Sequence, residues 1–230
     1  LLVLPFLPRG TWSLLRDWRL WLRAATLAAG ITCIQTALQT EAIANVFAAF
    51  FIGPMFSYLL AALFLRERIT LLRSALILLG FCGVLLVVRP GAEGGGPGLL
   101  FAVAAGLFYG VFLTMSRWLS DVAPPMALTF TQLAMSAVML LPLGLMTLPP
   151  PSVEVAALAS ASALFSMLGN LLLLYAYRQA PATRLAPLVY FQLIAAVLLG
   201  LFLFDTLPDL LTWAGLAVII AAGIASARLR

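Results

Sequence analysis

The sequence predicts an all-α fold, a polytopic bundle of membrane-spanning helices. Of its 230 residues, 64% are hydrophobic and only 9% are charged, whereas about 25% of residues are charged in a typical soluble domain. The mean hydropathy is +1.13, and no soluble fold could bury so much apolar surface. At ~20 residues for each crossing, the chain has room for at most about ten crossings. That leaves no space for a separate soluble catalytic domain.

Long apolar runs divide the chain into eight predicted spans joined by short connections. The first is the least apolar, because Arg19 and Arg23 lie in its opening turns. A Gly/Pro-rich linker at 91–97 separates an N-terminal part, 1–90, from a C-terminal part, 98–230. The predicted spans are 19–40, 42–65, 69–88, 97–119, 124–147, 155–178, 182–204 and 209–228.

Arginine placement predicts the orientation of the chain. All 13 basic residues are arginines, and the connections on one side of the membrane hold every one except Arg89. The positive-inside rule predicts that this side, with the C-terminus, faces the cytoplasm. The membrane is accordingly predicted to be the cytoplasmic (inner) membrane. Topology therefore explains the basic balance, and no nucleic-acid partner is needed. The cytoplasmic set is Arg9, Arg16, Arg19, Arg23, Arg66, Arg68, Arg73, Arg117, Arg178, Arg184, Arg228 and Arg230.

Residue types that the chain lacks argue against enzyme chemistry. It has no histidine and no lysine, which removes histidine-based zinc or haem sites and lysine Schiff bases. Cys33 and Cys82 lie in apolar runs, which predicts that both are small core residues. No acidic residue lies deep in a predicted span, so paired intramembrane aspartates are absent. We expect no catalytic residue, metal or cofactor, and transport by facilitated diffusion or exchange, or by coupling through helices upstream of this chain.

The two halves of the chain align at a shift of 139 residues. The spans 19–40 and 42–65 then fall on 158–179 and 181–204, and Gly30 meets Gly169. Thr70 meets Asp209, and each is a good N-cap for the helix that follows. Each repeat would hold five helices, an odd number, so the second copy enters the membrane inverted, as in many secondary transporters.

The first repeat is predicted to be incomplete. The partner of span 124–147 would run from position −15 to 8, which makes residues 1–8 the tail of a truncated second helix. A signal peptide is the competing interpretation, but residues 1–8 lack a basic region and a small-residue cleavage site. We therefore expect a fragment of a longer protein.

Three stretches of the chain resemble the EamA-type drug/metabolite transporter superfamily. They are AAFFIGPMF at 48–56 with AALFLRERIT at 61–70, GFCGVLLVVRPG at 80–91, and LYAYRQAPATRLAPL at 174–188. The resemblance implies ten helices, of which about eight are present here. The chain departs from the family pattern at three positions: Arg66 replaces a glycine before Glu67, Thr206 replaces the equivalent glutamate of the second half, and Leu193 replaces a proline. A symmetric role for the two turns is therefore in doubt.

Polar groups and prolines inside spans mark the candidate binding residues, because such groups are costly in hydrocarbon. Pro54 leaves the carbonyl of Phe50 without its helical partner, and Pro187 does the same for Thr183. The competing interpretation for each polar side chain is a hydrogen bond between helices. The resemblance implies that the helices carrying most of them line a central cavity. The candidates are Gln35, Asn45, Pro54, Tyr58, Tyr109, Ser166, Asn170, Tyr190 and Gln192.

The sequence favours a transporter that moves a small, amino-acid-like metabolite outward by alternating access. The alternatives are efflux of cationic or aromatic drugs, on which tyrosines could stack, and a lipid-handling protein without solute transport. Expected partners are a small-molecule solute and the lipid bilayer, with a homodimer as a candidate assembly. Two glycine pairs, Gly106 with Gly110 and Gly80 with Gly83, predict close helix packing. Glu67 is interpreted as a partner of the neighbouring arginines.

Overall fold

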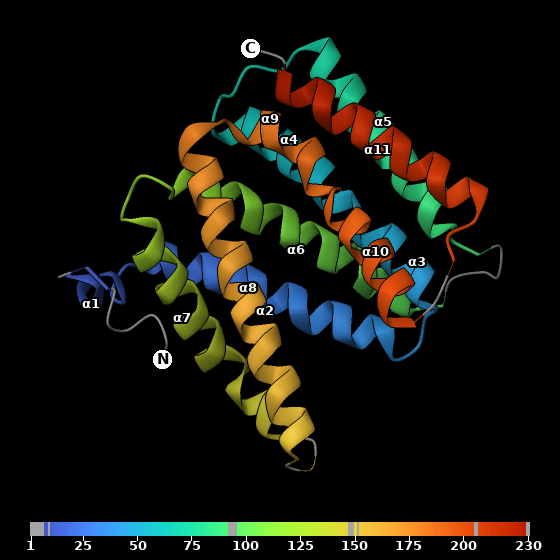
Figure 1. Ribbon diagram of the computed structural model, residues 1–230. Coiled ribbons are helices and arrows are strands. Elements are labelled where there is room, and N and C mark those ends of the chain that lie inside the picture. Colours follow the sequence, from blue (N-terminus) through green and yellow to red (C-terminus); the bar gives the residue numbers. More distant parts are fainter. Residues whose placement is uncertain are drawn as a thin grey trace. The chain divides into compact units, whose positions relative to one another are not determined.

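The computed structural model describes residues 7–8, 10–91, 96–146, 150, 152–204 and 207–228. These residues form eleven helices and no strand, as the predicted all-α class requires (Figure 1). The helices are α1 (Thr11–Leu14), α2 (Trp18–Leu38), α3 (Ile43–Phe50), α4 (Ile52–Phe64), α5 (Leu71–Val88), α6 (Gly98–Trp118), α7 (Pro125–Met146), α8 (Val153–Gln179), α9 (Ala182–Val189), α10 (Gln192–Phe204) and α11 (Leu210–Arg228).

Seven helical segments of the described chain are long and apolar enough to cross a membrane. They match seven of the predicted spans, and two of them, Ile43–Phe64 and Ala182–Leu199, are interrupted by a short break. The predicted first span does form a helix, α2, but it is not among the seven. The polytopic helical bundle is thus confirmed.

The chain divides into two compact units. Unit 1 comprises Leu1–Ala28 and Met115–Gln179, and unit 2 comprises Ala29–Thr114 and Ala180–Arg230. Each unit takes residues from both sides of the 91–97 linker. The two units are described separately below.

Unit 1 is held together by arginine side chains that bind backbone carbonyls. Arg23 is fully buried and donates to Ser116 Oγ at 2.9 Å and to the carbonyl oxygen of Leu128 at 3.3 Å. Arg117 donates to the carbonyl of Tyr177 at 2.7 Å, and Arg178 to those of Ser120 and Ala123. The carbonyls that Arg117 and Arg178 bind lie at or beyond helix ends, where no intrahelical donor remains. Arginines that the sequence indicated as topology signals therefore also close the ends of helices.

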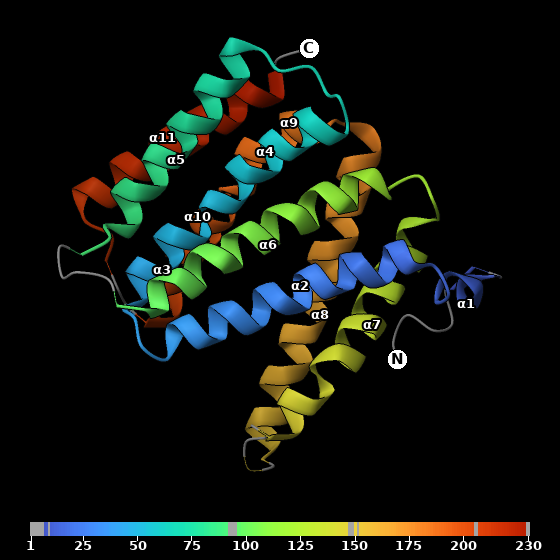
Figure 2. The ribbon, with the colours of Figure 1, turned by 180° about the vertical axis from the view of Figure 1, so that it is seen from behind.

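In unit 2, α3 and α4 pack against α6, and α4 also packs against α9. Ala37 of α2, Val46 of α3 and Ala102 of α6 share one buried cluster. A Cβ atom on Gly53 would lie 2.7 Å from the carbonyl oxygen of Gly106, so the backbones of α4 and α6 nearly touch (Figure 2).

The second glycine-mediated contact in unit 2 joins α5 to α11. A Cβ atom on Gly83 would lie 2.9 Å from the carbonyl oxygen of Gly215, and one on Gly215 would lie 2.8 Å from that of Gly83. Both predicted glycine pairs are therefore confirmed as sites of close helix packing.

Helix boundaries in unit 2 follow the 139-residue shift. α3 (Ile43–Phe50) falls on α9 (Ala182–Val189), and α5 and α11 begin at corresponding residues. The predicted N-caps are confirmed: Thr70 accepts from the amide of Arg73 at 3.2 Å, and Asp209 from that of Thr212 at 3.0 Å. In Figure 1, α5 and α11 run in opposite directions, as the inverted repeat requires.

Two arginines of unit 2 adopt left-handed backbone conformations, Arg66 at φ 54° and Arg89 at φ 45°. This region favours glycine, which gives a physical reason for the glycine that the family resemblance implies at the position of Arg66. Arg89, the one arginine outside the predicted cytoplasmic set, forms an ion pair with Asp209. Hydrogen bonds from Arg89 and Thr212 hold the pKa of the Asp209 carboxyl well below its usual range.

The contribution of the N-cap of α5 to stability can be tested by mutation. Replacing Thr70 by Ala removes the only side-chain acceptor for the Arg73 amide, and we expect a loss of about 1 kcal/mol in the free energy of unfolding. Thr70→Ser keeps the acceptor and should stay close to wild type. Equilibrium unfolding of both variants in detergent micelles compares them, and equal stability would rule out a stabilising cap.

The close approach of α6 to α3 and α4 can be tested with two Gly→Ala variants. A Cβ on Gly106 would lie 2.7 Å from the carbonyl oxygen of Phe50 and 2.9 Å from Ile52 Cγ2, so Gly106→Ala should lower stability by about 1–3 kcal/mol. A Cβ on Gly144 of α7 meets no atom within 4 Å. Gly144→Ala should therefore leave stability unchanged or raise it by about 0.5–1 kcal/mol. Thermal unfolding that ranks the two variants the other way would contradict this packing.

Candidate functional site

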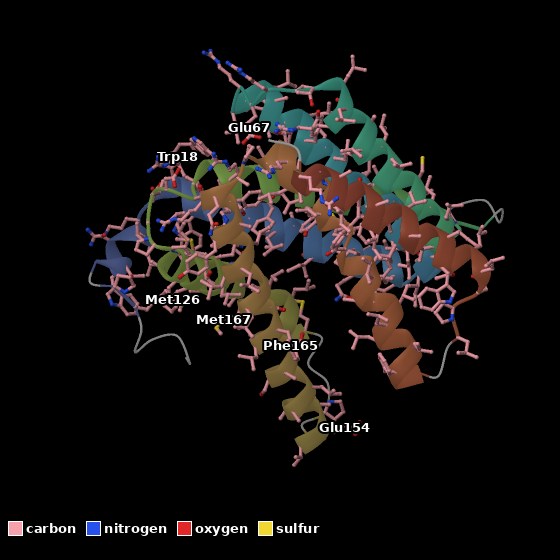
Figure 3. The ribbon with its side chains drawn as sticks, turned by 45° about the horizontal axis from the view of Figure 1, so that its top comes forward. Trp18, Glu67, Met126, Glu154, Phe165 and Met167 are labelled. Carbon is pink, nitrogen blue, oxygen red and sulfur yellow. The ribbon has the colours of Figure 1, made fainter. Side chains whose placement is uncertain are left out.

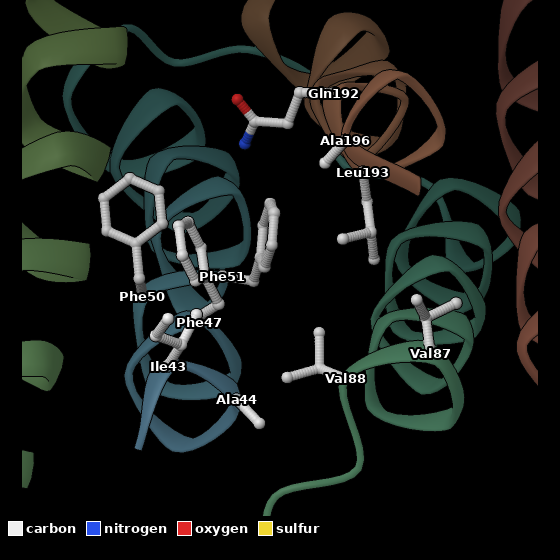
Figure 4. A pocket seen from close by; sticks show the side chains of 10 residues that line it. All are labelled: Ile43, Ala44, Phe47, Phe50, Phe51, Val87, Val88, Gln192, Leu193 and Ala196. Atoms are coloured by element: carbon white, nitrogen blue, oxygen red, sulfur yellow. The ribbon is translucent and has the colours of Figure 1, made fainter. Parts of the chain in front are cut away.

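Unit 2 contains a cavity of about 600 Å³, which we call the aromatic cavity. Its walls come from α3, the C-terminal end of α5 and the start of α10 (Figure 4). The end of unit 2 at which α3 and α11 begin and α5 ends is called the α3 end. The aromatic cavity lies toward this end. The opposite end, where α9 begins and α4 ends, is called the α9 end. The lining residues are Ile43, Ala44, Phe47, Phe50, Phe51, Val87, Val88, Gln192, Leu193 and Ala196.

Three phenylalanines form the principal wall of the aromatic cavity. Phe47, Phe50 and Phe51 stand at i, i+3 and i+4, which places them on one side of the helix end. Their ring centroids are 5.9–6.4 Å apart. Tyr109 of α6 stacks on Phe50 at 5.0 Å, and Tyr190 contacts Phe51 edge-to-face at 6.1 Å. This backing holds the phenylalanine rings in place.

Gln192 supplies the only polar side chain among the ten lining residues. It is exposed, and its amide points into the space between α10 and α3 (Figure 4). A carboxamide offers two donor hydrogens and one acceptor oxygen. No lining residue carries a charge. The cavity therefore suits an uncharged, flat, apolar group with a hydrogen-bonding edge.

Two helices related by the 139-residue shift are broken at corresponding places. The first break is at Phe51, between α3 and α4, and the second is at Tyr190 and Phe191, between α9 and α10. Phe51 and Tyr190 are partners under the 139-residue shift, and their rings touch. The proline lies on opposite sides of the two breaks: Pro54 follows the first by three residues, and Pro187 precedes Tyr190 by three.

The counterpart of the aromatic cavity at the α9 end is closed. Two of the ten lining residues are buried, but eight of their ten partners under the 139-residue shift are buried. The buried partners are Gly53, Pro54, Ser57, Ala182, Thr183, Ala186, Tyr190 and Ser226. The two ends of unit 2 are thus formed by corresponding sequence positions, but the side chains are mostly accessible at the α3 end and mostly buried at the α9 end.

The closed α9 end is tied by polar contacts between elements. The Glu67 carboxylate accepts from the backbone amides of Ala182 at 3.0 Å and Thr183 at 2.8 Å. Glu67 follows the left-handed Arg66 and lies near the start of α9 (Figure 3). Tyr58 shares a hydrogen bond of 2.9 Å with Ser74.

The structure brings four of the predicted site residues to the aromatic cavity or next to it. Gln192 lines it, while Tyr109 and Tyr190 back its phenylalanines. Asn45 lies on α3, but its Oδ1 accepts from the amide of Gly91 at 2.7 Å.

The other predicted site residues lie elsewhere. Pro54 and Tyr58 are buried toward the α9 end, and Gln35 is exposed on α2. Ser166 and Asn170 belong to α8 of unit 1. Ser166 is exposed, whereas Asn170 Oδ1 accepts from Arg23 at 3.2 Å, the interhelical bond that the sequence left as the alternative.

The sequence prediction missed the phenylalanine trio and the binding partners of Glu67. The trio was visible as three phenylalanines at helical spacing just before Gly53 and Pro54. The role of Glu67 had no local signal, because its partners lie 115 and 116 residues away. In the described chain, no group of three or more Cys, Asp or Glu residues is placed to hold a metal ion.

Comparison with protein families identifies the architecture. The sequence model of the EamA-like transporter family matches residues 1–89 and 96–227. The chain belongs to this family. An S-adenosylmethionine uptake transporter of Rickettsia conorii is 28% identical over 200 residues, covering 86% of this chain and 68% of the relative.

A second relative of this EamA-like transporter supports the same assignment. A riboflavin transporter of Brucella anthropi is 28% identical over 232 residues, covering 97% of this chain and 82% of the relative. A solved crystal structure shares the fold with a TM-score of 0.77 at 20% sequence identity, over 94% of this chain and 79% of that one. The chain is thus a multi-pass membrane protein of a transporter family.

Tyr190 allows the packing at the site to be tested separately from its hydroxyl group. The Tyr190 ring is fully buried, and its hydroxyl has no hydrogen-bond partner among the described residues. Tyr190→Phe should therefore fold with unchanged or slightly higher stability, because no hydrogen bond is lost. Tyr190→Ala should lose about 3–5 kcal/mol through the cavity it leaves. Thermal unfolding in detergent measures both, and a large loss in Tyr190→Phe would reveal a hidden partner.

Proposed function

We propose that this EamA-like transporter takes up an uncharged metabolite with a planar aromatic ring, by alternating access across the cytoplasmic membrane. The observation that carries the proposal is the aromatic cavity, open at the α3 end, together with the closure of its repeat-related counterpart at the α9 end. The volume lies within the 300–1,000 Å³ range of small-molecule sites.

Alternation follows from the relation between the two ends. We propose that 1–90 and 98–230 are the two inverted repeats and that rocking one against the other exchanges their conformations. The α9 end would then open around the partners of the present lining residues, while the α3 end closes. A solute that contacts Phe51 on one side of the break would contact Tyr190 on the other, so it need move only a short way.

The distribution of charge supports an aromatic cavity that faces the outer side of the membrane. Arg66, Arg68 and Arg73 lie between α4 and the first turn of α5, and Arg184 and Arg228 are at the start of α9 and the end of α11. All five belong to the α9 end. Under the positive-inside rule that end faces the cytoplasm, and the open cavity receives solute from outside.

The lining favours an aromatic cargo over the amino-acid-like cargo that the sequence suggested. A zwitterion would leave two charges without partners in a low-dielectric site, which is costly. Three phenylalanine rings instead offer stacking and edge-to-face contacts, and Gln192 can bond the edge of a heterocycle. Riboflavin, named for one relative, contains a planar heteroaromatic ring. A cationic aromatic drug is the closest competitor, because cations also bind to ring faces.

The direction of transport is proposed as uptake. The sequence suggested export, but one relative is named for uptake, and in the proposed orientation the cavity opens toward the outer side. A lipid-handling protein remains the competing class, because an apolar cavity could also hold an acyl chain.

Counterflow in proteoliposomes tests the proposal. The protein from its full reading frame would be reconstituted into vesicles loaded with unlabelled riboflavin, S-adenosylmethionine, an amino acid mixture or a cationic dye, and the same labelled solute added outside. We expect accumulation with the flat, uncharged compound. Gln192→Ala should reduce the counterflow rate about tenfold, because the solute would lose one or two hydrogen bonds to the carboxamide.

Gln39→Ala is the matched control, since Gln39 is exposed in the turn after α2 and should leave the rate unchanged. Accumulation of amino acids alone would restore the cargo first suggested by the sequence. Accumulation of none of the four, with protein that retains its thermal unfolding transition, would favour the lipid-handling class. Transport that Gln192→Ala leaves intact would place the site elsewhere.

A further inference from the structure

The N-terminus of α9 is capped by a residue from a distant part of the chain. Its own N-cap is Pro181, which has no side-chain acceptor, and the first amides of a helix need partners outside it. Glu67 supplies both oxygens, one to the amide of Ala182 and one to the amide of Thr183. The negative charge also suits the positive end of the helix dipole.

This contact joins the two repeats, as the ion pair of Arg89 with Asp209 does, whereas two other polar ties of unit 2 stay within one repeat. Asn45 binds the amide of Gly91 after α5, and Arg184 binds the carbonyl of Ala227 near the end of α11. Asn45 and Arg184 are partners under the 139-residue shift, so each tie connects the first half-helix of a repeat to the last helix of the same repeat. Glu67 instead reaches from the first repeat to the second.

The sequence contains no equivalent of Glu67 for the α3 end. The partner of Glu67 under the shift is Thr206, which lies outside the described residues, and threonine has a single neutral oxygen on a shorter side chain. The N-cap of α3 is Ala42, which has no side-chain acceptor. The α3 end has its own charged tie between the repeats, the ion pair of Arg89 with Asp209, but a carboxylate that caps the first half-helix of the other repeat is found only at the α9 end among the described residues.

The closed α9 end also buries hydroxyls that have no partner there. Thr183 Oγ1 and Tyr190 Oη are buried without a hydrogen-bond partner among the described residues. Buried hydroxyls without partners raise the free energy of the closed state. A state in which they gain hydrogen-bond partners would recover that free energy. Their partners under the shift, Ala44 and Phe51, line the open cavity. Opening the α9 end would bring both hydroxyls into contact with water or solute.

From these observations we infer that Glu67 is the cytoplasmic latch of the transporter. Its two hydrogen bonds hold α9 of the second repeat against the first and keep the α9 end closed. Their release opens an inner half-cavity that presents the hydroxyls of Thr183 and Tyr190 to the hydrogen-bonding part of the solute. The inference rests on the proposed alternating access but not on the identity of the cargo.

Cysteine accessibility tests the latch without any substrate. In a background with Cys33 and Cys82 replaced by serine or alanine, one reporter is Ala186→Cys, which is buried at the α9 end, and the other is Ala44→Cys in the open cavity. A membrane-impermeant maleimide is applied to inside-out vesicles for the first and to spheroplasts for the second. Glu67→Gln should raise the labelling rate at position 186 about tenfold and lower that at position 44.

Two further variants separate a latch from a simple helix cap. Pro181→Ser gives α9 a local N-cap, so the double variant Pro181→Ser with Glu67→Gln keeps the helix start satisfied without the tie between repeats. We expect this double variant to keep the labelling rates of Glu67→Gln at both positions, fast at position 186 and slow at position 44. Asp121→Asn removes another exposed carboxylate from the predicted cytoplasmic side and should leave both labelling rates at the wild-type level.

Three results would overturn the latch. They are unchanged labelling in Glu67→Gln, faster labelling at both reporters together, which signals general loosening, and a return to the wild-type pattern on adding Pro181→Ser. Because labelling needs no solute, these outcomes are independent of the counterflow result. Reciprocal labelling changes with no transported solute would keep the latch and remove the proposed cargo.

Discussion

The requirement that backbone polar groups be satisfied inside a membrane governs this structure. A helix meets that requirement along its own length, but a broken helix does not, and the break has to be covered by protein. Unit 2 has two such breaks, at Phe51 and at Tyr190, and covers each with the other: the two rings are in contact, and both residues are buried. Gly53 and Gly106 permit the close approach of α6 on the opposite side of the first break. The aromatic cavity lies beside the same crossing.

The helices of unit 2 that are paired by the 139-residue shift share boundaries but not surfaces. The aromatic cavity is lined by Phe47, Phe50 and Phe51, whereas the corresponding positions of the second repeat hold Ala186, Val189 and Tyr190. A site built from rings at one end and from small and hydroxyl-bearing residues at the other presents different chemistry in its two proposed states. The charged tie from Glu67 to α9 adds a second difference between the ends. Such differences allow one state to be preferred even though the architecture is a repeat.

Arginine has two roles in the chain. Its distribution across the connections indicates the orientation, as the positive-inside rule predicts. In unit 1, Arg117 and Arg178 also bind carbonyl oxygens near helix ends, and Arg23 binds groups on three other segments. The planar guanidinium group, with five N–H donors, can serve several acceptors at once, which a lysine ammonium cannot do with the same geometry. This difference offers a physical reason for a basic set without lysine.

The sequence by itself determined the membrane class, seven of the helical spans, the N-caps Thr70 and Asp209, and the 139-residue shift that relates the helix boundaries of unit 2. These features depend on local apolar content, on short-range capping and on spacing along the chain, all of which one sequence displays. The tertiary structure alone decided that Asn170 binds Arg23, that Glu67 caps α9 and that one end of unit 2 is open. Each of these depends on which side chains meet across more than 100 residues of chain. Composition and periodicity carry no information about such pairings, because a polar residue within a span can equally serve a solute or a neighbouring helix.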